Sequence, residues 1–170
     1  YRLTGEIFTD VSDASGTGLF DVERRTWANE LMEKIGISTS LFPKCLESAA
    51  RAGSVTALAA AETGLPEGTA VFAGGGDAVV SMIAMGLGEK GKIGITLGTS
   101  GVVAMGLPAY GRNKGGLLQM FCSNIPGGWM AFGCTLSAAG SYQWFHDALG
   151  RGSFKELDDL AELVEPGSGG

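Results

Sequence analysis

The spacing of apolar side chains divides this chain into helical and strand-like segments separated by short polar or glycine-rich stretches. Apolar residues that recur every three to four positions predict helices, and short apolar runs between turn residues predict strands. The predicted helices are residues 23–35, a short one opened by Pro43, and residues 54–64, 77–87, 135–149 and 154–164. The predicted strands lie within residues 18–22, 69–74, 92–106, 116–123 and 128–134, where 92–106 is a hairpin and the last two form a pair. This order indicates a mixed α/β chain in two pieces.

Three segments and the tryptophans give more specific predictions. Residues 10–17 are small and polar, and they predict a loop in which Asp13 and Ser15 bond nearby backbone amides. Residues 69–74 are an apolar run that predicts a buried strand. In the helix predicted over residues 77–87, one face carries Val80, Ile83, Ala84 and Leu87. Each tryptophan lies within an apolar pattern, so packing roles are predicted for Trp27, Trp129 and Trp144.

Composition and charge favour small-molecule chemistry. The chain contains 29 glycines in 170 residues and has a formal net charge of −6, with Lys and Arg scattered along it. Scattered basic residues argue against a nucleic-acid partner, and no apolar run reaches the roughly 18 residues that a membrane span requires. The glycines lie at the ends of apolar runs, where they predict tight turns and close backbone approaches. An acidic protein with a small-molecule substrate fits these features.

Several familiar catalytic and metal-binding patterns are missing from the sequence. The three cysteines, Cys45, Cys122 and Cys134, form no C-x-x-C pair, so we expect buried apolar thiols in a reducing compartment. "GGGDAV" lacks the last glycine of G-x-G-x-x-G, and the sequence contains no Walker A motif. His146, the only histidine, lies deep within a predicted helix, which indicates an ordinary structural or surface role.

The first candidate site is "GGGDAV", in which three glycines join a predicted strand to a helix that opens with Asp77. Glycines let a ligand approach the backbone closely, and the dipole of the helix favours a carboxylate at its N-terminus. Such a carboxylate can accept a proton from an attacking hydroxyl, which is general-base catalysis. The alternative interpretation is that Asp77 only caps the helix.

The second candidate site is "LGTSG", residues 97–101, in the turn of the predicted hairpin. Successive small residues expose backbone N–H groups, and the hydroxyls of Thr99 and Ser100 add donors. Together they suit phosphate oxygens. The alternative interpretation is an ordinary hairpin built from turn-forming residues.

Four stretches, "TDVSDASGTGLFDV", "AGGGDAVVSMIAMGLG", "ITLGTSGVVAM" and "TLSAAGSYQWFHDALG", together resemble the FGGY carbohydrate kinases and, within that family, the xylulokinases. The resemblance is collinear over nearly the whole chain and corresponds to the middle part of such a kinase. It implies a partial actin-like ATPase fold of the ribonuclease H-like type. Residues 1–88 would then end the sugar-binding lobe, and residues 89–170 would begin the nucleotide-binding lobe.

The resemblance also implies roles for the candidate residues. Asp77 matches the catalytic base, which takes the proton of a sugar hydroxyl as that oxygen attacks the γ-phosphate of ATP. Gly76 and Ala78 flank it in the substrate site. The residues that match nucleotide-binding positions are Gly98, Thr99, Ser100, Gly101, Gly140 and Gln143, with Ala139 beside them. The implied substrates are ATP, with Mg²⁺, and a ketopentose, D-xylulose above all, and no residue of the chain is assigned as a metal ligand.

Two departures from the family pattern concern the sugar. Ala78 stands where xylulokinases commonly carry an asparagine that helps to hold the sugar, and Gln119 and Ser123 replace histidines of the later hairpin. A kinase for another ketose, a polyol or glycerol is therefore an alternative. Two further alternatives remain. The first is a family member that binds sugar or nucleotide without catalysis, and the second is an actin-like structural ATPase.

The resemblance further implies a cytoplasmic protein, for which a homodimer is one possible assembly. The chain opens on Tyr1 and stops in "EPGSGG", which suggests part of a longer protein. The first phosphate hairpin, further sugar-binding residues and the adenine-binding glycine loops of the family are not in this sequence. We therefore predict that the 170 residues alone are inactive.

Overall fold

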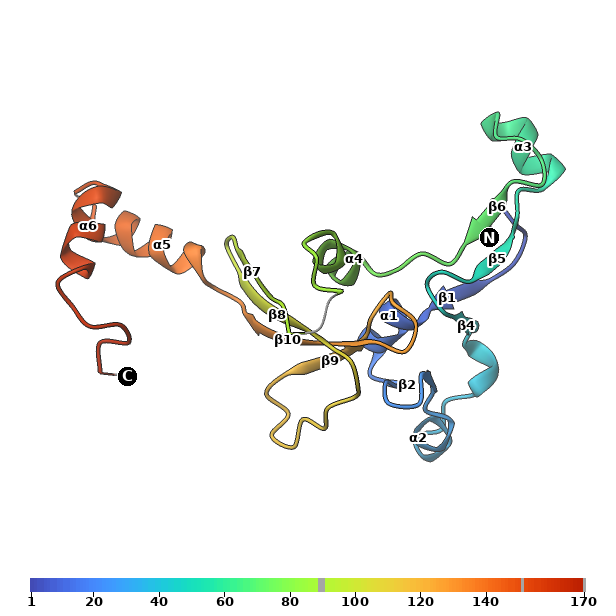
Figure 1. Cartoon of the computed structure of the whole chain (residues 1–170), viewed down its shortest axis with the longest axis horizontal. Coiled ribbons are helices and arrows are strands. Elements are labelled where there is room, and N and C mark those ends of the chain that lie inside the picture. The colour runs from blue at the N-terminus through green and yellow to red at the C-terminus, as the bar shows by residue number, and fades with distance from the viewer. Residues whose placement is uncertain (89–90, 151, 170) are drawn as a thin grey trace. The chain divides into compact units, whose positions relative to one another are not determined.

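The computed structural model describes residues 1–88, 91–150 and 152–169 and divides into two compact units (Figure 1). The larger unit consists of Tyr1–Gly94 and Val103–Gly133, and the smaller unit of Ile95–Val102 and Cys134–Gly170. The lobe boundary predicted after residue 88 falls at residues 89 and 90, which lie outside the described residues. Each unit contains both helical and strand segments.

The chain contains both short helices and short strands, in mixed order, which confirms the mixed α/β class. The α-helices are α1 (Val11–Ala14), α2 (Asn29–Lys34), α3 (Ala57–Thr63), α4 (Asp77–Ala84), α5 (Ala139–Leu149) and α6 (Phe154–Ala161), with 3₁₀ turns η1 (Ser15–Thr17) and η2 (Thr39–Leu41). The strands are β1 (Phe8–Asp10), β2 (Phe20–Asp21), β3 (Thr26–Trp27), β4 (Lys44–Leu46), β5 (Arg51–Ser54), β6 (Ala70–Phe72), β7 (Ile93–Leu97), β8 (Gly101–Leu107), β9 (Gln119–Cys122) and β10 (Trp129–Thr135). No helix within the described ranges combines the length and the apolar character needed to cross a bilayer.

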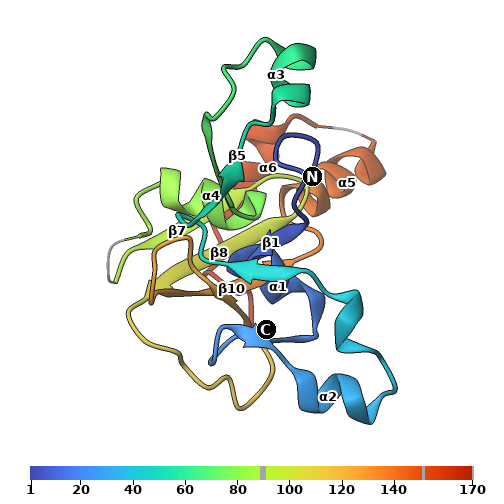
Figure 2. The same cartoon turned by 90° about the vertical axis from the view of Figure 1, so that its right-hand side faces the viewer.

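Strand pairing confirms both predicted strand pairs and adds others. β1 pairs with β4 in parallel, and Phe8 lies opposite Lys44. β2 and β3 are antiparallel, as are β5 and β6, which α3 connects (Figure 2). A four-stranded sheet has the order β7-β8-β10-β9. In it β9 and β10 are antiparallel, and β7 is joined to its neighbour β8 through residues 98–100, as predicted.

The core of the larger unit gathers side chains from α1, β2 and β9. Its buried members are Val11, Ala14, Phe20 and Cys122, against which Val22, Trp27, Cys45 and Trp129 pack. The indole N–H of Trp27 donates to the carbonyl oxygen of Pro43 at 2.9 Å, and that of Trp129 donates to the carbonyl oxygen of Val22 at 2.8 Å. Both tryptophans therefore have the packing role predicted for them, with their polar atoms satisfied.

The prediction of a loop over residues 10–17 is wrong, because residues 11–17 form α1 and η1. Asp10 is the N-cap residue of α1, and its carboxylate accepts hydrogen bonds from the amides of Ser12 and Asp13. Val11 and Ala14, which lie one helical turn apart, are buried in the core. With only two apolar positions, this capped turn lacks the longer periodicity by which helices are recognised in a sequence.

The helix predicted over residues 23–35 is shorter than expected, since α2 begins at Asn29. Arg25 has a left-handed backbone conformation, with φ of 56°, and β3 follows it and pairs back onto β2. The prediction of a helix after Pro43 is also wrong, because residues 44–46 form β4. The strand that pairs with β4 is β1, which is distant in sequence, so this pairing overrides the local preference for a helix.

The predictions for α3, β6 and α4 agree with the structure to different degrees. α3 is confirmed, with Thr56 as its N-cap and Gly64 ending it at φ of 76°. β6 forms where a strand was predicted, but it is not buried, because β5 is its only paired strand in the described chain. α4 buries Val79 and Met82, so its buried face differs from the one marked in the sequence.

In the smaller unit α5 contacts α6 through one of its faces. The ring of Phe154 stacks on His146, with centroids 4.1 Å apart, and the hydroxyl of Tyr142 donates to Asp158 Oδ1 at 2.6 Å. His146 thus has the structural role predicted for it. Trp144 lies on another face of the same helix and is 69% exposed, so its predicted packing role is wrong for the described chain.

Candidate functional site

The glycine loop before α4 presents Asp77 as the first residue of that helix. Gly74 has φ of 78°, a left-handed conformation that favours glycine, and Gly76 occupies the N-cap position with no side chain to offer. Asp77 is exposed, and its Oδ1 accepts from the amide of Ala78 at 2.6 Å. The carboxylate therefore lies at the positive end of the helix dipole and is open to solvent.

A polar pocket of about 530 Å³ surrounds this carboxylate. It brings Asp77 and Gly76 together with side chains from β1 and α1, and its lining is Phe8, Thr9, Asp10, Asp13, Ala73, Gly75, Gly76 and Asp77. Its volume falls within the roughly 300–1,000 Å³ that small-molecule sites occupy. Ala78 is not part of its lining.

Asp10, one of the lining residues, has a buried carboxylate that accepts four hydrogen bonds. Its Oδ2 accepts from the amide of Ser12 at 2.8 Å, from Ser12 Oγ at 2.6 Å and from Ser48 Oγ at 3.0 Å. Its Oδ1 accepts from the amide of Asp13 at 3.2 Å. The sequence analysis did not single out Asp10 or Ser48, although a polar residue directly after an apolar strand was a visible signal for Asp10.

The described residues do not form a protein cage for Mg²⁺. They contain no group of three or more His, Cys, Asp or Glu side chains placed to hold a metal ion. The donors around Asp10 already occupy its oxygens. Mg²⁺ in phosphoryl-transfer sites is commonly held by one or two carboxylates together with substrate phosphates and water. We therefore assign no residue of this chain to the metal.

Two cysteines near this site are inert thiols. Burial, followed by the charge of Asp10, raises the pKa of Cys45 to about 12. Burial likewise raises the pKa of Cys122. Both side chains therefore stay protonated at neutral pH and act as small apolar groups, as predicted. Cys134, in contrast, is exposed, which differs from the prediction.

Arg25 clamps the turn between β9 and β10. Its guanidinium binds Glu47 through two hydrogen bonds of 2.6 and 2.7 Å, and it donates to the carbonyl oxygens of Gly128 at 2.8 Å and Ser123 at 3.4 Å. It also lies 5.4 Å from the ring centroid of Trp129. Burial lowers the pKa of Arg25, but the bonds to Glu47 and nearby charges outweigh it, so the pKa is raised overall. The left-handed backbone of this non-glycine residue is thus offset by its side-chain contacts.

We expect Arg25→Lys to lower the free energy of unfolding of the complete gene product by about 1–3 kcal/mol. Lysine keeps the charge but cannot make the paired bonds to Glu47 and also reach both carbonyl oxygens. Urea unfolding measures the change. Arg24→Lys is the matched control, because that neighbouring side chain is 72% exposed, and it should stay within about 0.5 kcal/mol of wild type. Equal losses in the two variants would contradict the clamp.

The second candidate site lies in the smaller unit, where the hairpin turn meets the start of α5. The amides of Ala138 and Gly140 donate to the carbonyl oxygen of Thr99 at 2.8 and 3.2 Å, and the amide of Ala139 donates to that of Gly98 at 3.0 Å. A Cβ on Gly140 would lie 2.9 Å from this Thr99 oxygen. The first amides of α5 are therefore occupied by the hairpin, and Gly140 permits the close approach.

A pocket of about 590 Å³ brings together Thr99, Gly140 and Gln143, three of the residues predicted to bind nucleotide, and also includes Trp144 and Asp147. Gln143 Nε2 donates to both carboxylate oxygens of Asp147 at 2.9 and 3.0 Å. This contact lowers the pKa of Asp147, with a further contribution from His146.

Gly98, Ser100 and Gly101 do not line this pocket. Gly101 is buried, and a Cβ there would lie 3.0 Å from Thr135 and Ala138. Trp144 and Asp147 were not predicted as site residues, and their helical spacing from Gly140 was the available signal.

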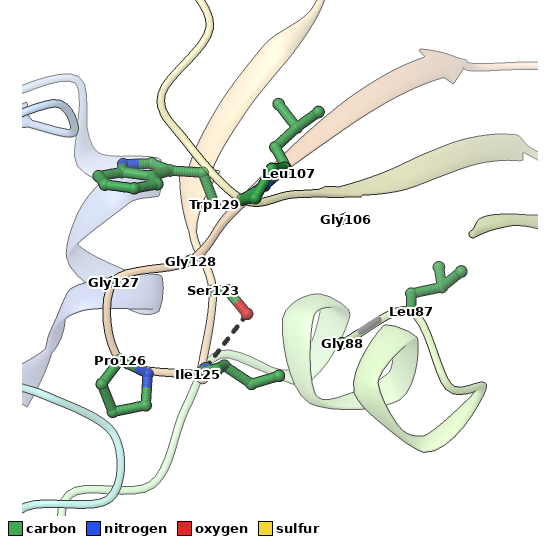
Figure 3. Close-up of a pocket in the computed structure, with 11 residues that line it drawn as sticks. Leu87, Gly88, Gly106, Leu107, Ser123, Ile125, Pro126, Gly127, Gly128 and Trp129 are labelled. Carbon is green, nitrogen blue, oxygen red and sulfur yellow. Dashed lines mark hydrogen bonds between the residues drawn. The ribbon is translucent and has the colours of Figure 1, made fainter. Parts of the chain in front are cut away.

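A further pocket, of about 190 Å³, lies beside the turn between β9 and β10 (Figure 3). Leu87 and Gly88 line it after α4, and Leu107 and Trp129 lie on its other side. The hydroxyl of Ser123 accepts from the amide of Ile125 at 3.2 Å. The pocket is smaller than typical small-molecule sites, so we assign no ligand to it.

Comparisons with known proteins show which family the sequence resembles. The profile of the FGGY family of carbohydrate kinases, N-terminal domain, matches residues 1–84. A xylulose kinase of Lactococcus lactis is 38% identical over 169 residues, which cover 99% of this chain and 34% of that protein. A xylulose kinase of Bacillus subtilis is 35% identical and is likewise covered to 34% of its length. The chain therefore spans about a third of these curated relatives.

The arrangement of the backbone also matches a solved structure. A crystal structure described as a xyloylose kinase from Brucella ovis superposes with a TM-score of 0.84 at 33% sequence identity. The match covers 96% of this chain and 34% of that chain. Sequence and backbone thus point to the same group of proteins.

Proposed function

Because this chain belongs to the FGGY family of carbohydrate kinases and has part of their actin-like ATPase fold, we propose that its complete protein transfers the γ-phosphate of ATP to a ketopentose. D-xylulose, giving D-xylulose 5-phosphate, is the substrate that we favour, because relatives named xylulose kinase match nearly the whole chain. The observation that carries the proposal is the exposed carboxylate of Asp77, which opens α4 behind a glycine loop and faces a polar pocket.

The larger unit would supply the base. Asp77 would accept the proton of the attacking sugar hydroxyl while the new oxygen–phosphorus bond forms and the bond between the γ-phosphorus and ADP breaks. Gly76 and the polar lining would let the sugar approach the carboxylate closely. Since phosphoryl transfer depends mainly on positioning and charge stabilisation, one aligned base is sufficient on this side.

The smaller unit would bind the nucleotide. Thr99, Gly140 and Gln143 line a pocket of adequate size. Gly98 and Ser100 belong to the hairpin turn together with Thr99, and Gly101 begins the strand that follows it. Because the carbonyl oxygens of the turn occupy the first amides of α5, phosphate oxygens would be bound by the turn rather than by that helix terminus. Mg²⁺ bound with ATP would neutralise charge on the transferring phosphate.

Ala78 supports a second candidate within the same family. A methyl group cannot make the hydrogen bonds of the asparagine that xylulokinases commonly have, so another ketose, a polyol or glycerol is the alternative acceptor. A binding protein without catalysis is a further alternative, which the presence of Asp77 disfavours. The cytoplasmic location, the homodimer and the inactivity of the 170 residues alone stay predictions.

The test is ADP release by the complete gene product with ATP, Mg²⁺ and a panel of ketopentoses, polyols and glycerol. We expect release that depends on a ketopentose and is fastest with D-xylulose. Faster release with a polyol or glycerol would transfer the assignment to the second candidate. Release no faster than with ATP alone, for every acceptor, would contradict the kinase function.

A further inference from the structure

Asn124 lies in the turn between β9 and β10 and reaches two segments next to Asp77. Its Nδ2 donates to Ser12 Oγ at 3.1 Å and to Ser48 Oγ at 2.8 Å. In Figure 1 this turn lies beside α1, the helix that contains Ser12. Three segments that are distant in the sequence therefore meet at one side-chain amide.

Asp10 fixes the direction of these hydrogen bonds. The hydroxyls of Ser12 and Ser48 both donate to Asp10 Oδ2. A hydroxyl has one proton, so each serine oxygen is left as an acceptor and must face the NH₂ group of Asn124. The opposite orientation would place the amide oxygen of Asn124 against two oxygens whose protons are already used.

This orientation leaves the amide oxygen of Asn124 in an unfavourable environment. Asn124 Oδ1 is buried and has no hydrogen-bond partner among the residues that the structure describes. Leaving a buried acceptor unpaired costs free energy, whereas hydrogen bonds to a carboxylate are stronger than neutral ones. The amide therefore keeps this orientation because the network around Asp10 requires it.

The same network holds the glycine loop in front of Asp77. Ser12 Oγ accepts from the amide of Gly76 at 2.9 Å, so the residue before Asp77 is tied to the hydroxyl that Asn124 binds. A Cβ on Gly75 would lie 1.9 Å from Asn124 Nδ2 and 2.8 Å from its Cγ. Asn124 thus packs directly on the loop backbone, where only a hydrogen atom fits.

We propose that Asn124 is a positioning residue for Asp77, an inference that rests on the proposed kinase function. Asn124 and Ser12 hold Gly75 and Gly76, and they thereby fix the direction in which the carboxylate of Asp77 leaves the start of α4. A glycine loop is otherwise free to move, and a displaced catalytic group loses much of its effect. Asn124 itself does not contact the reacting atoms.

The first test is Asn124→Ala in the complete gene product. We expect kcat with the best sugar to fall about 10–100-fold, while KM for sugar and for ATP changes less than about threefold. Asn113→Ala is the matched control, because its side-chain amide likewise donates a hydrogen bond within the same unit, to the backbone oxygen of Leu118, and kcat of this variant should not change. An unchanged kcat for Asn124→Ala, or a higher KM for sugar at unchanged kcat, would overturn the positioning role.

The second test uses the contact with Gly75. Gly75→Ala should lower kcat about tenfold in the wild-type background, because its methyl group displaces the Asn124 amide. In the Asn124→Ala background the same change should cost less than about threefold, since the methyl group enters vacated space. Equal losses in both backgrounds would refute the contact.

A third measurement does not depend on activity. Asn124→Ala should accelerate hydrogen exchange of the Gly76 amide about tenfold, because Asn124 no longer holds Ser12 Oγ, the acceptor of that amide, and no longer packs on the loop. Asn113→Ala should leave this exchange unchanged. Asn124→Ser replaces Asn124→Ala if the alanine variant does not fold. If the complete protein phosphorylates no sugar, the proposed function fails, and exchange alone decides whether Asn124 holds the loop. Unchanged exchange overturns the inference.

Discussion

Replacing Asp77 with asparagine is expected to lower kcat of the complete gene product about 10²–10⁴-fold, the usual contribution of a general base. Asparagine has nearly the same shape, but its amide cannot accept the proton of the attacking hydroxyl. KM for sugar and ATP should change little, since a general base acts mainly in the transition state. Steady-state ADP release with the best sugar measures the effect.

The control for this substitution is Glu30→Gln. Glu30 is also an acidic residue in the first turn of a helix of the larger unit, so its replacement removes the same interaction with a helix dipole. Both variants should therefore lose only about 0.3–1 kcal/mol of unfolding free energy, and only Asp77→Asn should lose activity. A kcat within about threefold of wild type for Asp77→Asn would remove Asp77 from the mechanism.

The second large effect is expected for Gly140→Ala, which should raise KM for ATP about tenfold or more. The added Cβ would lie 2.8 Å from Thr99 Cγ2 and 2.9 Å from its backbone oxygen, so the hairpin turn must move. That movement would lengthen the hydrogen bonds from the amides of Ala138 and Gly140 to Thr99. Overpacking of this kind commonly destabilises a protein by about 1–3 kcal/mol.

Ser141→Ala is the control for the hairpin contact. Its hydroxyl donates to Ser137 Oγ at 2.7 Å on the exposed side of the same helical turn, so its removal should leave KM for ATP unchanged. KM for sugar should be unchanged in both variants, because the pocket that we propose for the sugar belongs to the larger unit. If Gly140→Ala binds ATP as tightly as wild type, the nucleotide assignment of this hairpin is wrong.

The sequence predicts the parts of both sites that depend on neighbouring residues. Glycines followed by an acid and a helical pattern indicated that Asp77 opens a helix, and α4 begins at that residue. The turn at residues 98–100 and the left-handed end of α3 at Gly64 also follow from local turn chemistry. Tertiary contacts change such signals little, because the backbone conformation itself selects these residue types.

The sequence does not predict contacts that join distant segments. The network of Asp10, Ser12, Ser48 and Asn124 joins three segments of the chain. No local sequence pattern in these segments indicates which distant residues they contact. The parallel pairing of β1 with β4 displaced the helix predicted after Pro43 for the same reason. Trp144 lies in an apolar pattern, yet its face of α5 is exposed in the described chain.

The most direct test of the central claim measures ADP and sugar phosphate together. The complete gene product is incubated with ATP, Mg²⁺ and D-xylulose, and both products are followed by ³¹P NMR, beside Asp77→Asn. We predict equal amounts of ADP and sugar phosphate from the wild-type protein and almost none of either from the variant. ADP formed without sugar phosphate, or equal turnover by the variant, would contradict a sugar kinase in which Asp77 is the base.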